Sequence, residues 1–125
     1  MPLTNAGRNH LVALLTNTST IHFDNANSHI VVGDGNAAFN ASQTQLQGAN
    51  TARKQVESGF PLVQDNQVKF KAIFDKTEAN FAWNEWGLIN QASGGTLLNR
   101  QVEYNGTKLN GQTWIMEVTI EVVTN

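Results

Sequence analysis

The spacing of apolar residues predicts one helix near the N-terminus. Three leucines recur at the three- and four-residue intervals of a helical face. They are Leu11, Leu14 and Leu15. Thr4 or Asn5 can cap the start of this helix, because their side-chain oxygens accept hydrogen bonds from free backbone N–H groups. We therefore predict a helix over about residues 5–16, which is short enough that it must dock its leucine face on a larger body.

Downstream of the helix, the pattern changes to the alternation that is typical of strands. Residues 66–75 place apolar side chains on one face and two lysines on the other, as a half-buried strand does. Residues 113–123 carry the clearest strand pattern of the chain. The other predicted strands cover about residues 29–35, 51–58, 81–90 and 95–104. Residues 36–48 lack a strong period, which predicts a long loop with one helical turn at about 42–46.

Short turns rich in glycine and asparagine separate these strands and favour antiparallel pairing. The sequence therefore predicts a mainly β fold, an antiparallel β-sandwich or barrel-like domain with one short N-terminal helix. A chain of 125 residues can bury a core without disulfides, and no internal repeat or linker-like segment divides it. We expect residues 1–125 to form a single domain, with strands from about residue 28 to residue 123.

Composition narrows the classes of function. Eight basic residues against ten acidic ones leave no basic excess of the kind that nucleic-acid-binding domains carry. No apolar run approaches the roughly 20 residues that cross a bilayer, and the N-terminus lacks a signal-peptide pattern. The absence of cysteine removes disulfides and thiolate chemistry and fits a reducing cytoplasm. Only 14% of residues are charged, so we expect other chains to cover part of the surface.

Candidates for metal binding and catalysis are few. His22 and Asp24 form the only close His–carboxylate pair, whereas metal sites bring three or four ligands together. Asp34, Asn36 and Asp24 offer hard-oxygen ligands for calcium, but the Gly-Asp-Gly stretch at 33–35 is typical of a turn. No phosphate-binding glycine pattern and no nucleophile-elbow serine is present. The sequence thus predicts no metal, no cofactor and no enzymatic activity.

One acid has unusually apolar neighbours. Glu85 lies between Trp83 and Trp86, and in a regular strand it shares a face with Trp83. A buried carboxylate without a partner costs several kcal/mol, so it needs a cation or hydrogen-bond donors. Arginine suits such a site, because its planar fork matches both carboxylate oxygens. We predict a buried Glu85–Arg53 or Glu85–Arg100 bridge that acts as a structural anchor and fixes strand register.

Six segments follow one another between about residues 29 and 100. They are IVVGDGN, QTQLQG, ARKQV, VKFKAIF, FAWNEWGLIN and GGTLLNR. Their order resembles small structural proteins of tailed bacteriophages. It is also loosely similar to the N-terminal domain of phage tail-collar fibres, where an acid, an apolar residue, glycine and leucine follow one another. Glu85, Trp86, Gly87 and Leu88 match that pattern. Tail-collar fibres continue into a long shaft, whereas this chain ends at Asn125, a departure that favours a free-standing coat component.

The resemblance implies a virion structural protein that assembles in the host cytoplasm, without a nucleic-acid or membrane partner. We expect a capsid decoration (cement) protein that binds the major capsid lattice as a small homo-oligomer. A tail adaptor, baseplate or fibre-attachment protein is the alternative. A carbohydrate-binding module is a more distant one, since β-sandwiches with exposed tryptophans often stack on sugars. Trp86 is then either an interface anchor or part of the ordinary core.

Overall fold

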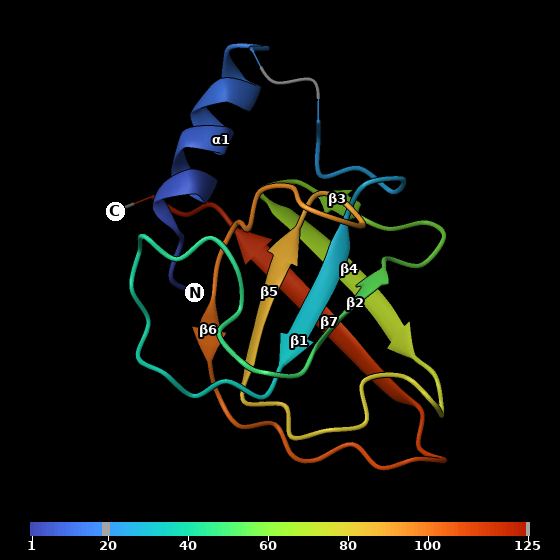
Figure 1. Cartoon of the computed structure of the whole chain (residues 1–125). Helices are drawn as coiled ribbons and strands as arrows, with labels where there is room; N and C mark the ends of the chain where they lie inside the picture. The colour runs from blue at the N-terminus through green and yellow to red at the C-terminus, as the bar shows by residue number, and fades with distance from the viewer. Residues whose placement is uncertain (19–20, 125) are drawn as a thin grey trace.

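The computed structural model describes residues 1–18 and 21–124 and confirms a mainly β fold with one short N-terminal helix (Figure 1). Its elements are α1 (Asn5–Leu15), β1 (His29–Gly33), β2 (Thr51–Gln55), β3 (Leu62–Gln64), β4 (Gln67–Phe74), β5 (Glu85–Ile89), β6 (Gln101–Val102) and β7 (Trp114–Glu121). The strands form two antiparallel sheets with the orders β2-β1-β5-β6 and β3-β4-β7. No helix in the described ranges is both long and apolar enough to span a membrane.

The main core lies between the two sheets. Inward-facing side chains of β1 and β5 meet those of β4 and β7, and the alternation predicted for β4 and β7 is confirmed. The buried members are Ile30, Val32, Val56, Phe70, Ala72, Phe74, Ala79, Trp83, Leu88, Leu98 and Val118. Burial of a large apolar side chain stabilises the fold by about 1.5–3 kcal/mol. The burial of these side chains is therefore the main contribution that holds the two sheets together.

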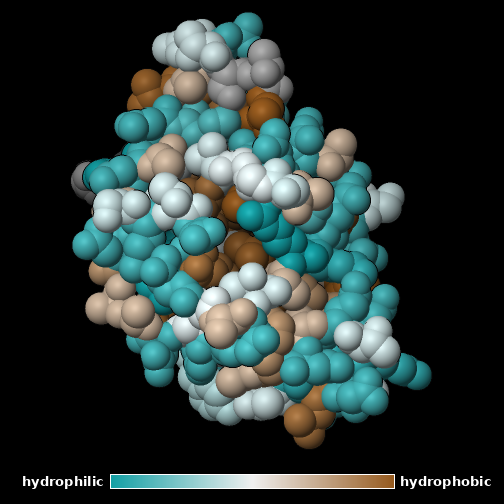
Figure 2. All heavy atoms as spheres, in the orientation of Figure 1, coloured by the Kyte–Doolittle hydropathy of each residue, from teal (hydrophilic) through white to brown (hydrophobic). Residues whose placement is uncertain are grey.

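A loop over residues 34–50 covers the outer face of the four-stranded sheet. A second apolar cluster lies under it, formed by Val31, Leu46, Ile89 and Leu97. Figure 2 shows a hollow with apolar side chains at its base on this side of the molecule. β1 is consequently buried on both faces. The predicted loop is confirmed, but the helical turn at 42–46 is absent, because the Gln47 N–H donates to a side chain of the sheet instead of to a helical carbonyl.

The N-terminal half of α1 docks on the sandwich, and in its second turn His10 Nε2 lies 3.2 Å from the side-chain nitrogen of the buried Asn90. Thr4 caps the helix as predicted, and its hydroxyl oxygen accepts a hydrogen bond from the Gly7 N–H at 2.8 Å. Gly7 is the one buried residue of α1. It approaches the sheet so closely that a Cβ there would lie 2.2 Å from the Leu98 carbonyl oxygen, so only glycine fits. The C-terminal half of α1 projects from the body (Figure 1), so the predicted docking of the leucine face is wrong for Leu11 and Leu15, which are 40% and 87% exposed.

The strand predicted over residues 81–90 is shorter than expected. β5 begins at Glu85, and the segment before it pairs with the connection after β6. Trp83 N–H donates to the Gly106 carbonyl, and Asn105 N–H donates to the Trp83 carbonyl, each at 2.8 Å. Because residues 81–84 leave the strand, Trp83 enters the main core instead of sharing a face with Glu85 as predicted.

Two further strands differ from the predicted pattern. The expected strand 95–104 reduces to the two residues of β6, because Leu97 bridges Ile89 and Asn99 bridges Leu3 instead of continuing one ladder. β3, which the sequence pattern did not predict, is fully exposed and pairs with β4 through a two-residue turn. Asp65 occupies that turn with a positive φ of 52°. The short strand therefore depends on its turn and not on a buried face.

Candidate functional site

Glu85 and Arg100 form a buried ion pair, so the second of the two predicted bridges is present. Arg100 Nε lies 2.8 Å from Glu85 Oε1, and both side chains are 0% exposed. Glu85 opens β5 and Arg100 directly precedes β6, so the pairing of these strands brings the two residues together. Arg100 Nη1 also donates to the Ala37 carbonyl at 3.0 Å and to Gln43 Oε1 at 3.2 Å. The control of strand register by this pair stays a prediction.

The carboxylate of Glu85 is also saturated by backbone donors of the 34–50 loop. Oε1 accepts from the N–H of Gln47, and Oε2 accepts from the N–H groups of Gly35 and Gly48, each at 2.8 Å. These bonds, together with the arginine, satisfy a buried charge that would otherwise be costly. The group is therefore an anchor that ties the loop to the sheet, and its carboxylate has no exposed oxygen to offer a substrate.

The Gly-Asp-Gly stretch owes its glycines to this anchor. A Cβ at Gly35 would lie 2.5 Å from both Glu85 Oε2 and the Gly48 nitrogen, so a larger residue would push the loop away. Asp34 accepts hydrogen bonds from the Asn50 backbone N–H at 3.0 Å and from its side-chain amide at 2.7 Å. The hydrogen bond from the Asn50 side-chain amide is the main cause that lowers the pKa of Asp34 below its ordinary value. Both carboxylate oxygens of Asp34 thus close the base of the 34–50 loop, and the turn predicted at 33–35 does not form there.

The alternative bridge with Arg53 is wrong. Arg53 Nη1 donates to the carbonyl oxygens of Gln91 and Gly94, each at 2.8 Å. The physical reason is strand order, since β1 lies between β2, which carries Arg53, and β5, which begins with Glu85. Burial lowers the pKa of Arg53 below its ordinary value. Arg53 therefore holds the turn after β5 instead of neutralising Glu85.

The histidines and aspartates do not gather into a metal site. His10 Nε2 lies 2.8 Å from the Ile21 carbonyl oxygen, and His29 Nδ1 lies 2.9 Å from that of Asn27. Asp24 accepts hydrogen bonds from the backbone and side-chain nitrogens of Asn27. Within the described part of the chain, no group of three or more His, Cys, Asp or Glu side chains could hold a metal ion.

One buried charge was missed by the sequence reasoning. Lys108 lies between the strands predicted over residues 95–104 and 113–123, in a stretch rich in glycine and asparagine, yet it is 0% exposed. Its Nζ donates to the Asp75 carbonyl at 2.6 Å and to Asn80 Oδ1 at 2.8 Å. Lys108 thus closes the turn between β4 and β5 from inside. A lysine within a run of glycine and asparagine gave no periodic signal that could have revealed this role.

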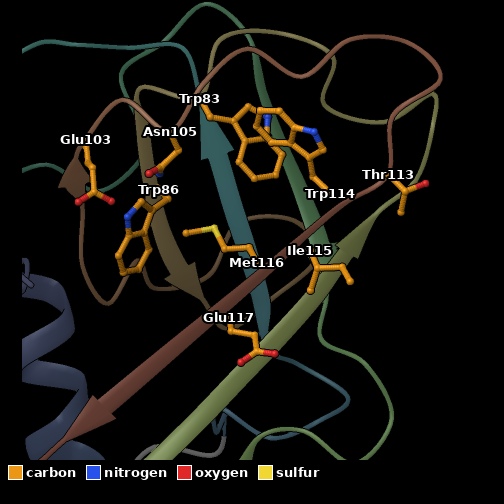
Figure 3. Close-up of a pocket in the computed structure, with 9 residues that line it drawn as sticks. All are labelled: Trp83, Trp86, Glu103, Asn105, Thr113, Trp114, Ile115, Met116 and Glu117. Carbon is orange, nitrogen blue, oxygen red and sulfur yellow. The ribbon is translucent and has the colours of Figure 1, made fainter.

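A cleft of about 540 Å³ opens between the two sheets along the side formed by their edge strands β6 and β7. Trp83 and Trp86 line it from the β5 side, and Trp114 and Met116 line it from β7 (Figure 3). The rings of Trp83 and Trp114 meet edge to face with centroids 5.0 Å apart. Trp86 is half-buried and packs against the main core, which agrees with the core interpretation of this residue. Its interface role stays a prediction.

A larger apolar groove of about 790 Å³ lies between α1 and the three-stranded sheet. Leu11 and Leu14 line it from the helix, and Phe70, Ile120 and Val122 line it from the sheet and the segment after β7. Leu11 is 40% exposed and Val122 is 74% exposed, so the groove is covered only in part by its own chain. The strand β7 therefore connects two open regions, the tryptophan cleft at its beginning and this groove at its end.

Comparison of the chain with protein-family models, with curated proteins and with solved structures found no significant match.

Proposed function

We propose that this chain is a structural protein of a tailed-bacteriophage virion, which decorates the capsid by binding the major capsid lattice as a small homo-oligomer. The observation that carries the proposal is the partly covered apolar groove beside α1. The order of segments between residues 29 and 100, which resembles phage structural proteins, supplies the class of particle. Both features suit a protein whose role is to contact other chains.

The helix supplies the strongest physical argument for a missing partner. α1 has 11 residues, and helices of this length are marginal unless an apolar face is buried. Only Gly7 is buried, while Val12 is 61% exposed and Leu15 is 87% exposed. Contiguous exposed apolar patches mark contact sites on soluble proteins, and Leu11 and Leu14 of the same helix line the apolar groove. A second chain that covered the helix and the groove would stabilise both.

The tail-associated alternative depends on the motif shared with tail-collar fibres. Glu85 of that motif anchors the 34–50 loop, and a Cβ at Gly87 would lie 2.3 Å from the Asn99 carbonyl oxygen. These roles maintain the fold and are needed equally in a head or a tail protein. The motif thus supports the particle class without favouring the tail, and the location within the particle requires an experiment.

The first prediction concerns location. Electron cryo-microscopy of the virion that carries this protein is expected to show density for the sandwich on the outer surface of the capsid lattice, with the α1 groove in contact with protein. Density at the tail instead would support the adaptor alternative. Absence of the sandwich from mature particles would overturn both.

The second prediction concerns association. Leu11→Lys places a charge in the groove while keeping good helix propensity, so we expect at least tenfold weaker self-association by analytical ultracentrifugation. Asn9→Lys is the matched control, because it adds the same charge at an exposed position of α1 that does not line the groove. Equal oligomer formation by both variants, or a wild-type protein that stays monomeric, would contradict the use of this groove between copies.

A further inference from the structure

The tryptophan cleft holds free recognition groups that the fold does not use. All three tryptophans of the chain line it. On its rim, the side chains of Glu103, Asn105 and Thr113 make no hydrogen bond or ion pair within the described residues. The backbone of the first two is held in place, since Glu103 N–H donates to the Asn84 carbonyl and Asn105 N–H donates to the Trp83 carbonyl, each at 2.8 Å. An acceptor, an amide and a hydroxyl are thus presented beside indole rings.

The walls of the cleft come from different sheets. Figure 3 shows Glu103, Asn105 and Trp86 on one side of Met116, with Trp114 and Thr113 on the other. Trp86 belongs to β5, and Glu103 and Asn105 follow β6. Trp114 begins β7, and Thr113 directly precedes it. Because these segments form the open side of the sandwich, a ligand longer than one ring can extend along the gap.

The charge and polarity of the cleft restrict the ligand. Glu103 and Glu117 line it, whereas no lysine, arginine or histidine does, so phosphates, carboxylates and acidic sugars are repelled. Glu117 is partly engaged, because Lys69 Nζ lies 3.7 Å from its carboxylate on the outer side of the sheet. A purely apolar ligand would leave the rim carboxylate and amide without partners. The complementary ligand therefore combines apolar faces with several hydroxyl groups.

We propose that this cleft binds a neutral pyranose saccharide, with C–H faces of the sugar against Trp86 and Trp114 and hydroxyl groups bonded to Glu103, Asn105 and Thr113. An organic cation is the competing ligand class, since indoles and carboxylates also attract quaternary ammonium groups. Such a cage needs ring faces on several sides, but Trp83 is only 3% exposed and packs edge to face with Trp114. Two available indoles and an amide fit a sugar better.

The experiment uses the tryptophans as their own reporter, because no other tryptophan contributes to the fluorescence. Wild-type protein is titrated with neutral oligomers of glucose, galactose, mannose and N-acetylglucosamine, and separately with tetramethylammonium. We expect saturable quenching or a spectral shift with at least one of the neutral oligosaccharides. Asn105→Ala and Glu103→Ala are expected to weaken that binding about tenfold each, the loss typical of a hydrogen bond to a charged or well-placed polar group.

Glu121→Ala is the control for Glu103→Ala, because it makes the same substitution on β7 outside the cleft and is expected to bind like wild type. The substituted rim side chains hold no other part of the fold, so a loss of binding can be separated from unfolding by thermal denaturation. No response to any neutral saccharide overturns the proposal. Saturable binding of tetramethylammonium alone, weakened by Glu103→Ala, also overturns it and assigns the cleft to organic cations. Neither result bears on capsid binding, which concerns the α1 groove.

Discussion

Two connections of the molecule, the 34–50 loop and the turn between β4 and β5, are each held by a buried charge, but by opposite means. The 34–50 loop donates three backbone N–H groups to Glu85, whose charge Arg100 balances at 2.8 Å. The turn between β4 and β5 instead accepts from Lys108 through the Asp75 carbonyl and Asn80 Oδ1, and no salt bridge to Lys108 forms among the described residues. An anion thus organises one connection and a cation the other.

The difference lies in how much each charge depends on its surroundings. The Glu85 and Arg100 side chains are both 0% exposed, so loss of the arginine leaves a buried carboxylate without its cation. Lys108 bonds to a carbonyl and an amide that lie in an exposed turn, where water can replace it. The anchor of the 34–50 loop should therefore be far less tolerant of substitution than the anchor of the turn.

The largest effect is expected for Arg100→Met. The variant keeps most of the side-chain volume but leaves Glu85 buried without its cation, which costs about 3–5 kcal/mol. Urea denaturation followed by circular dichroism measures this loss in the free energy of unfolding. Arg53→Met is the control. It removes the hydrogen bonds at 2.8 Å to the carbonyls of Gln91 and Gly94, but it leaves no buried carboxylate without a cation. A loss equal to that of the control would show that the ion pair does not anchor the loop.

A smaller effect is expected for Lys108→Met. It removes two hydrogen bonds but also a buried charge that has no salt-bridge partner, so we expect a loss of about 1–3 kcal/mol. Lys76→Met, an exposed lysine of the same turn, should change the free energy of unfolding by less than about 0.5 kcal/mol. If Lys108→Met lowered the free energy of unfolding as much as Arg100→Met, the two anchors would be equally sensitive to substitution, contrary to expectation.

Periodic features of the fold could be predicted from the sequence. The leucine spacing and Thr4 gave the helix, and the alternation in residues 66–75 and 113–123 gave β4 and β7 with the correct inward faces. Segments that leave a strand to serve tertiary contacts could not be predicted. Residues 81–84 carry a strand-like apolar pattern, but they pair with the connection after β6.

The Glu85–Arg100 anchor could be predicted only in part, because the local pattern shows the acid but not which arginine pairs with it. A lone acid among tryptophans indicates a buried bridge, and Arg53 and Arg100 are its two predicted partners. Strand order decided between them, and order is not encoded in any local pattern. The backbone donors at Gly35, Gln47 and Gly48 were equally hidden, because they come from a loop without periodicity. The tryptophan cleft needed Trp114, which lies 28 or more residues along the chain from the other two tryptophans.

The smallest effect should come from the exposed counterpart of the buried anchor. Lys54 Nζ lies 2.8 Å from Glu78 Oε1, but the two side chains are 27% and 37% exposed, so the pair contributes about 0.5 kcal/mol at most.

The Lys54 hydrogen bond is the main cause that lowers the pKa of Glu78 below 4.5. A carboxyl whose pKa falls on folding stabilises the fold above its unfolded pKa and loses that contribution as the pH falls through the folded value. The stability difference between wild type and Lys54→Met should therefore be constant from neutral pH down to about 4.5, decline below that pH, and vanish once the pH is below the folded pKa of Glu78. Denaturant midpoints measured across that range test this, and a difference that persisted in acid would mean that Lys54 contributes through packing of its aliphatic chain instead of through charge.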